Sequence, residues 1–203
     1  MMKGHWDIRY SETEGVYGKL PSPFWVQELS KCSGHLALLP CEGEGRNAVL
    51  AAQKGWNVDA VDSSAVGMAT CARWSKEAGV GKLVKTYVAD ALDFEGASDG
   101  YDVVGLFYAH MPNDIRQLFH RKAMSWLKPG GKIILEGFNS RQLTLHSGGP
   151  KDATMLFNIA QLESDFQGLV MEQMETVQTT LDEGPFHQGK AEIIRMVGTA
   201  PQL

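Results

Sequence analysis

A glycine-rich turn between two apolar segments constrains the fold more than any other part of the chain. The apolar residues 36–39 lead into a turn that contains Gly43 and Gly45, and a helical pattern follows it. A second apolar segment, 58–61, then ends on Asp62. The order of strand, glycine turn, helix, strand and acid is typical of open α/β sheets, in which a ligand lies across the carboxyl ends of the strands.

The residue types in this turn indicate the kind of ligand. Gly43 and Gly45 carry no Cβ, so the backbone can approach a bound molecule closely. An acid about 20 residues beyond such a turn, here Asp62, can accept hydrogen bonds from both hydroxyls of a ribose. The pattern therefore predicts a cofactor that contains adenosine, without yet saying which one.

The rest of the chain continues the alternation of strands and helices. We predict a short helix at 24–30, five strands at 35–39, 57–61, 83–88, 102–107 and 132–138, and helices at 46–54, 65–78, 114–127 and 159–166. The glycines and proline of 128–131 are expected to end the third of the long helices. Two further strands, 169–181 and 190–199, are separated by a Gly/Pro turn and predict an antiparallel hairpin. The fold class is α/β: a Rossmann-like, seven-stranded, mostly parallel sheet with a C-terminal antiparallel hairpin and helices on both faces.

Bulk properties narrow the possible partners. The 203 residues fit a single domain, for which we expect an N-terminal lid at 1–30 and an acceptor-side insertion at 139–168. The net charge is −5 and we find no run of five like charges, so neither nucleic acid nor a membrane is expected as partner. No apolar segment reads as a signal or a membrane span, and the default expectation is a cytoplasmic protein, monomeric or homodimeric. The three cysteines and six histidines show no metal-ligand spacing, so no metal is expected.

Two cofactors compete for the glycine turn. Residues 43–48 satisfy the dinucleotide pattern G-x-G-x-x-G/A, which would favour an NAD(P)-dependent oxidoreductase. A dinucleotide sets its pyrophosphate against the turn amides and the helix N-terminus, where Glu42 and Glu44 would repel it and Arg46 could offset only part of the repulsion. S-adenosylmethionine carries a sulfonium, an ammonium and a carboxylate but no phosphate, so an acidic turn suits it better.

A second acid supports the same choice. Asp90 and Ala91 directly follow the predicted strand 83–88, where a carboxylate can accept from the exocyclic amine of adenine. An aspartate that only stabilises a turn is the structural alternative.

Four segments carry a resemblance to a known family: 41–48, 60–64, 89–91 and 127–132. With them the chain resembles class I S-adenosylmethionine-dependent methyltransferases, and in particular the branch with the tellurite-resistance and thiopurine methyltransferases. The resemblance implies the strand order 3-2-1-4-5-7-6. It also implies which residues hold the cofactor: Cys41, Glu42, Gly43 and Gly45 at its methionine part, Asp62 and Ser63 at the ribose, Asp90 and Ala91 at the adenine, and Phe107 near the methyl group.

The chain departs from the family pattern in one place. Many class I enzymes have an acid at the end of the first strand and a glycine at the first position of the turn, where this chain has Leu39 and Cys41. Glu42 or Glu44 would then have to pair with the cofactor ammonium. The departure keeps open a catalytically silent cofactor-binding protein.

The chemistry predicted is methyl transfer to a small-molecule acceptor, for which a soft nucleophile such as a thiol or a chalcogen oxyanion is the candidate. A general base is needed only where the acceptor arrives protonated. His110, after the predicted strand 102–107, is the expected base or acceptor contact, with Tyr108 beside it. Tyr10 and Tyr17 are expected to close over the cofactor, whereas His187, in the hairpin turn, is expected to be exposed.

Overall fold

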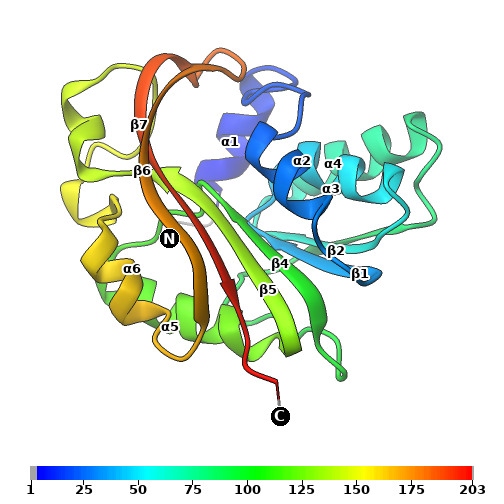
Figure 1. The fold of residues 1–203 in the computed structure, drawn as a ribbon. Helices are drawn as coiled ribbons and strands as arrows, with labels where there is room; N and C mark the ends of the chain where they lie inside the picture. The colour runs from blue at the N-terminus through cyan, green and yellow to red at the C-terminus, as the bar shows by residue number, and fades with distance from the viewer. Residues whose placement is uncertain (1–3, 203) are drawn as a thin grey trace.

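The computed structural model describes residues 4–202, and seven strands in this range form one sheet with the order β3-β2-β1-β4-β5-β7-β6 (Figure 1). Residues 1–3 of the predicted lid and residue 203 lie outside the described range. The helices are α1 (His5–Glu12), α2 (Pro23–Leu29), α3 (Arg46–Gln53), α4 (Ala65–Glu77), α5 (Asn113–Ser125) and α6 (Ile159–Asp165), with 3-10 turns at Ser140–Thr144 and Ala153–Met155. The strands are β1 (Leu36–Pro40), β2 (Asn57–Asp62), β3 (Val84–Val88), β4 (Tyr101–Phe107), β5 (Leu127–Phe138), β6 (Val170–Asp182) and β7 (Gln188–Thr199).

The sheet is parallel except at one side. β1 pairs in parallel with β2 and β4, and β5 pairs in parallel with β4. β7 runs antiparallel to both β5 and β6, so the last two strands form the predicted hairpin. The fold class and the strand order expected from the sequence are both confirmed.

Alternate residues of each central strand enter different apolar layers. On β1, Ala37 and Leu39 pack with α2, α3 and α4, while Leu38 packs with residues of α5 and α6 on the opposite face. Figure 1 shows α1 to α4 on one side of the sheet and α5 and α6 on the other. Burial on both faces explains why the central strands read as continuous apolar runs in the sequence.

Helix α1 is an element that the sequence did not predict. It lies against the start of α4, where Asp7 Oδ1 accepts hydrogen bonds from Ser64 Oγ at 2.5 Å and from the Val66 amide at 3.2 Å. These contacts join positions more than fifty residues apart, so no local pattern in the sequence announces them.

Strand β5 begins earlier than predicted. We expected residues 128–131 to end a helix, but α5 ends at Ser125 and these residues form the first part of β5. The Gly130 amide donates to Ala200 O at 3.1 Å, and the Ala200 amide donates to Gly131 O at 2.8 Å. Pairing with the C-terminal segment therefore extends the strand backward through the glycines.

Candidate active site

The centre of the site is the edge where β1 and β4 end side by side. β1 leads to β2 on one side, whereas β4 lies on its other side, so the strand order reverses between them. Cys41 follows β1 with φ 57°, and Tyr108 follows β4 with φ 52°. These are the non-glycine residues with left-handed backbone in the described range, and such strain concentrates at functional sites. Ligands of open α/β sheets bind at this reversal.

The glycine turn depends on the absence of side chains. A Cβ on Gly45 would lie 2.7 Å from Cys71 Cβ and 2.9 Å from the Cys71 backbone, so only glycine lets α3 and α4 approach. A Cβ on Gly43 would collide with the hydroxyl of Tyr10. The turn therefore presents bare backbone to the N-terminal segment above it.

Asp62 lies at the end of β2 beside this turn. Its Oδ2 accepts from the Gly43 amide at 2.9 Å and its Oδ1 from the Ser64 amide at 2.8 Å. Burial raises the pKa of Asp62 above its ordinary value, although the amides of Ser64 and Gly43 oppose the shift. Each oxygen has further acceptor capacity for a ribose hydroxyl. Ser63, predicted beside it, is exposed.

Asp90 and Ala91 follow β3 as predicted. Asp90 is exposed and its Oδ1 accepts from the Leu92 amide at 2.9 Å, which is the turn-stabilising contact that we had set as the alternative.

Burial raises the pKa of the Cys41 thiol, and the negative charges of Asp62 and Asp90 raise it further. The thiol is therefore protonated at neutral pH, and Cys41 is no nucleophile.

The two acidic residues of the turn have structural partners. Glu42 Oε1 accepts from the amides of Asn47 at 2.9 Å and Ala48 at 2.8 Å. Burial raises the pKa of Glu42 to about 7, against the opposing effect of these amides and of Arg46. The Glu42 side chain thus already binds the α3 N-terminal amides that a dinucleotide pyrophosphate would need. This argues against NAD(P) as the cofactor and so against an oxidoreductase.

Glu44 holds the N-terminal segment instead of facing the ligand space. Its two carboxylate oxygens accept from the amides of Gly15 and Val16, each at 2.8 Å. With Glu42 bound to α3 and Glu44 bound to this turn, both acids proposed to pair with the cofactor ammonium already have backbone partners.

Residues 15–18 form a turn that also meets the β6–β7 hairpin. A Cβ on Gly184 would collide with the Gly18 amide nitrogen and lie 2.7 Å from Val16 O. Two turns that are distant in the sequence therefore meet backbone to backbone. Below them Tyr10 stacks on Trp6 with ring centroids 5.8 Å apart, and its ring meets that of Tyr17 at 6.4 Å.

Phe107 ends β4 and Tyr108 follows it, and each has an aromatic neighbour from another element. Phe107 packs edge to face against Trp25 of α2, with ring centroids 5.4 Å apart. The Tyr108 ring lies 4.8 Å from the Phe138 ring, and its hydroxyl oxygen is buried without a hydrogen-bond partner in the described part of the chain. A buried hydroxyl without a hydrogen-bond partner lowers the stability of the folded protein. Such groups occur at sites where a bound ligand provides the missing hydrogen bond.

His110 is fully engaged by its surroundings. Its Nδ1 lies 2.9 Å from Met155 O, its Nε2 accepts from the Phe138 amide at 3.0 Å, and its ring stacks on Phe157. Burial lowers the pKa of His110 to about 4. The neutral ring has no free lone pair in this arrangement, so the predicted role as a base requires one of these bonds to break.

His187 does not have the exposed position that we expected. The residue is only 5% exposed, and its Nδ1 lies 3.2 Å from Glu183 Oε2. The same carboxylate oxygen accepts from Arg46 Nη2 at 3.0 Å. The ring meets Tyr17 at 4.5 Å and Tyr108 at 4.6 Å between centroids. The sequence signal was Glu183 placed four residues before a histidine across a tight turn.

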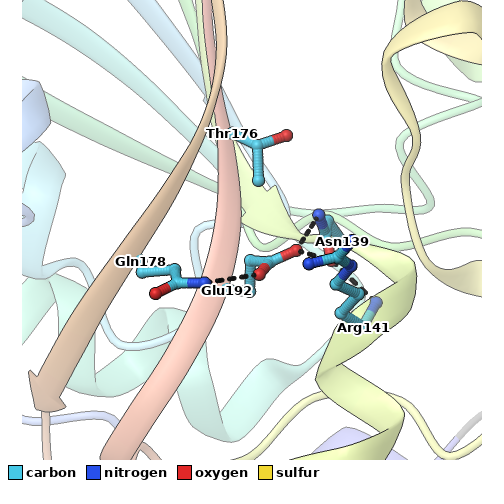
Figure 2. Close-up of a pocket in the computed structure, with 5 residues that line it drawn as sticks. All are labelled: Asn139, Arg141, Thr176, Gln178 and Glu192. Carbon is cyan, nitrogen blue, oxygen red and sulfur yellow. Dashed lines mark hydrogen bonds and ion pairs between the residues drawn. The ribbon is translucent and has the colours of Figure 1, made fainter.

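A separate polar hollow lies beside the 139–168 insertion. Its volume is about 470 Å³ and it is lined by Asn139, Arg141, Thr176, Gln178 and Glu192 (Figure 2). Glu192 accepts from Asn139 Nδ2 at 2.7 Å and from Gln178 Nε2 at 3.2 Å. Arg141 also pairs with Glu192 at 3.8 Å, so three of the lining side chains meet on this carboxylate, and none of the lining residues comes from the glycine turn.

The donor set at the strand ends fits S-adenosylmethionine. The bare backbone at Gly43, a buried carboxylate at Asp62 with capacity for hydroxyl donors, and an acid after β3 match a ligand with a ribose and an adenine. Over residues 4–202 no cluster of three metal-ligating side chains occurs. The same range holds no helix that is long and apolar enough to span a membrane.

Comparisons with known proteins agree with this geometry. Residues 38–131 match a family model described as a methyltransferase domain. A solved structure described as "Conversion of a Disulfide Bond into a Thioacetal Group during Echinomycin Biosynthesis" is similar with a TM-score of 0.78 and 18% identity, covering 99% of this chain and 93% of that one. TehB from Haemophilus influenzae gives 0.73 and 13%, covering 96% and 67%, and the CcbJ methyltransferase from Streptomyces caelestis gives 0.71 and 16%, covering 98% and 97%.

These structural likenesses are too distant in sequence to show more than the fold, and no curated protein matches the chain significantly. The family match adds the methyltransferase assignment to the core of that fold, from β1 to the start of β5. Residues 38–131 are thus a methyltransferase domain, and the cofactor of the enzyme is S-adenosylmethionine.

Proposed function

We propose that this enzyme methylates a small molecule with a soft nucleophilic atom, either a thiol or a chalcogen oxyanion. The observation that carries the proposal is the aromatic enclosure at the end of β4. The rings of Tyr17, Tyr108 and Phe138 lie within about 5 Å of the His187 ring, between centroids. Polarizable sulfur makes favourable contacts with aromatic rings, which favours the thiol. A chalcogen oxyanion would lose hydration there and is proposed on the family resemblance alone.

The cofactor would lie across the strand ends in the orientation that the family resemblance implies. Cys41, Gly43 and Gly45 would pass under its methionine part, with Glu42 fixing the turn through α3. Asp62 and Ser63 would bind the ribose. Asp90 and Ala91 would bind the adenine, with Phe107 toward the methyl side.

The bound cofactor supplies a methyl group that its sulfonium has already activated. The chain must align the acceptor with that group, and such alignment can contribute roughly 7–11 kcal/mol. Tyr10 and Tyr17 would exclude water from the aligned nucleophile as parts of the N-terminal lid, 1–30. Within the single domain, 1–203, the insertion 139–168 would close the acceptor side.

The surroundings of the enzyme follow from its charge. With a net charge of −5 we propose a cytoplasmic monomer or homodimer that acts on a small molecule and not on nucleic acid or at a membrane. The tellurite-resistance and thiopurine methyltransferase branch remains our proposal for its nearest functional relatives. The likeness to TehB is compatible with it at the level of fold.

Calorimetric titration with S-adenosylmethionine, S-adenosylhomocysteine and NADH tests the cofactor assignment. We expect micromolar binding of the first two and none of NADH. A screen of thiols and of selenite and tellurite, followed by mass spectrometry of methylated products, then tests the acceptor. Binding without turnover on any of these acceptors would favour a catalytically silent protein and contradict the proposal.

A further inference from the structure

We propose that His187 accepts the proton of the methyl acceptor, and that Glu183, held by Arg46, orients its ring. The inference rests on the proposed function and makes it more specific, because an acceptor that needs a base arrives protonated. Among soft nucleophiles this selects a thiol over a chalcogen oxyanion.

The hydrogen bonds fix which nitrogen is free. Glu183 Oε2 lies 3.2 Å from His187 Nδ1 and 3.0 Å from Arg46 Nη2, and these three side chains are at most 12% exposed. A carboxylate only accepts, so the proton of the neutral ring belongs on Nδ1 and the lone pair on Nε2. Within residues 4–202 no hydrogen bond reaches Nε2.

The edge of the ring that carries Nε2 faces a glycine. A Cβ on Gly148 would lie 2.7 Å from His187 Cδ2 and 3.5 Å from Nε2, and Gly148 has φ 129°. Because Gly148 has no side chain, it leaves the Nε2 edge of the His187 ring uncovered. This differs from His110, both of whose nitrogens are bonded.

The ring lies where an acceptor would bind. Tyr108 directly follows β4 at the strand reversal, has left-handed backbone and carries the unpaired buried hydroxyl. Its ring lies 4.6 Å from the His187 ring. A strained residue, a hydroxyl without a partner and a histidine with a free nitrogen therefore meet next to the expected methyl group.

Titratable side chains from four segments of the chain face His187. Glu183 is in its own turn, Arg46 is on α3, Tyr17 is in the N-terminal segment, and Tyr108 and His110 follow β4. Burial lowers the pKa of His187, and the hydrogen bond and charge of Glu183 oppose that shift without reversing it. The imidazole is therefore neutral near pH 7 and able to take a proton.

The proposed step balances as follows. The thiol proton moves to Nε2 of His187, and the electron pair of the broken S–H bond forms the new bond from sulfur to the methyl carbon. The bond from that carbon to the sulfonium breaks with its pair, which leaves a methyl thioether and S-adenosylhomocysteine. The imidazolium, stabilised by Glu183, then gives its proton to water.

The test compares two thiols of similar size and different acidity. Benzenethiol is substantially ionised near pH 7, whereas benzyl mercaptan is almost fully protonated. His187→Gln should slow methylation of benzyl mercaptan by about 100-fold or more, which is the usual worth of a general base. Benzenethiol should be slowed only a few-fold. His120→Gln, in a buried histidine of the opposite helix layer, is the matched control and should not separate the two thiols.

Three outcomes would count against the assignment. Unchanged turnover of benzyl mercaptan by His187→Gln overturns it, and so does an equal loss on both thiols while binding of S-adenosylhomocysteine by calorimetry is retained. If the wild type methylates neither thiol, the proposed thiol acceptor fails first and the assignment of the base falls with it. The wild-type result thus separates the two failures.

Two measurements test orientation by Glu183. Glu183→Gln keeps an acceptor but removes the charge that raises the His187 pKa, so the acid limb of the rate profile for benzyl mercaptan should move to lower pH. An unmoved limb would show that Glu183 is merely structural. Nitrogen-15 NMR of the wild type with S-adenosylhomocysteine bound should show neutral His187 protonated on Nδ1 at pH 7. The other tautomer would overturn the proposal without any substitution.

Discussion

Two clusters in this chain combine an arginine, a carboxylate and a histidine, and they differ in their surroundings. In one, Asp165 Oδ2 accepts from Arg116 Nε at 2.6 Å and lies 2.8 Å from His120 Nδ1, between α5 and α6. In the other, Glu183 joins Arg46 and His187 at the strand reversal. In both clusters one carboxylate oxygen lies between the arginine and Nδ1 of the histidine, at shorter distances for Asp165 than for Glu183.

The free nitrogen of each histidine shows the difference. His120 Nε2 is buried with no partner in the described range, and the ring stacks on Phe166 at 4.6 Å. His187 Nε2 faces the bare backbone of Gly148 beside two tyrosines. The Asp165 cluster therefore holds α5 and α6 together, whereas the Glu183 cluster leaves a histidine nitrogen available to a ligand. Residue types alone do not distinguish a structural cluster from a functional one.

The largest loss of stability should come from breaking the cluster of Arg116, His120 and Asp165. Asp165→Ala leaves the buried Arg116 without a carboxylate to neutralise its charge, although its Nη1 still donates to Asn113 Oδ1 at 2.6 Å, and this should lower the free energy of unfolding by about 3–5 kcal/mol. Glu183→Ala should cost less, because Arg46 and Glu183 are 9% and 12% exposed, against 4% and 0% for Arg116 and Asp165. Urea denaturation measures both, with Glu172→Ala in a surface ion pair as a control expected to change little. Equal losses at positions 165 and 183 would remove the distinction drawn here.

Cofactor affinity should depend on neither histidine cluster. Asp62→Ala should weaken binding of S-adenosylhomocysteine by about 1–3 kcal/mol through lost charge-assisted hydrogen bonds. His187→Gln and His120→Gln should leave the affinity within about two-fold, since neither lies at Gly43 or Asp62. Calorimetry would contradict the assigned ribose site if Asp62→Ala bound as tightly as the wild type.

Two tyrosine hydroxyls sharpen the contrast between structural and ligand-facing groups. Tyr101 Oη donates to the buried Asp59 at 2.7 Å, so Tyr101→Phe should cost about 1–3 kcal/mol of stability. Tyr108→Phe removes a hydroxyl that has no partner, and should change stability by at most about 0.5 kcal/mol or increase it. Thermal and urea unfolding of both variants check this. A large loss for Tyr108→Phe would mean that its hydroxyl is already satisfied.

The buried histidine of the Asp165 cluster should also make stability depend on pH. Burial lowers the pKa of His120 in the folded protein, and the hydrogen bond of Asp165 only partly opposes this. The unfolded chain therefore binds a proton first, and stability falls as the pH drops below the unfolded value of about 6.5. His120→Gln should flatten this loss by at most about 1.4 kcal/mol per pH unit. Denaturation between pH 7.5 and 5.5 measures it, and an unchanged slope would show that His120 binds its proton equally well in the folded and the unfolded protein.

Much of the fold could be predicted because its signals are local. The apolar segments, the glycine turn and the Gly/Pro turn of the hairpin each occupy a few consecutive residues. Helix α1 could not be found this way, since Asp7 secures it to Ser64 and Val66 across the fold. The extension of β5 through residues 128–131 likewise depends on Ala200, from the opposite end of the chain.

The site was harder to predict than the fold, for a related reason. Asp62 and Tyr108 were identified by their place after strands, which the alternation of elements fixes. The partners of Glu42 and Glu44 are backbone amides, one set from α3 and one from the turn at residues 15–16, and no residue type in the sequence marks a backbone amide. Burial of His187 needed the N-terminal turn to fold over the hairpin, a contact between Gly18 and Gly184.

That contact between the two turns has a kinetic consequence. The N-terminal segment contacts the glycine turn through Glu44 and the hairpin through Gly184. If this segment is the lid that we propose, a molecule reaching either half of the site would have to wait for it to move. Exchange of cofactor and exchange of acceptor would then share one opening rate. That opening rate would be an upper limit on the turnover number, which only the most reactive acceptors would reach.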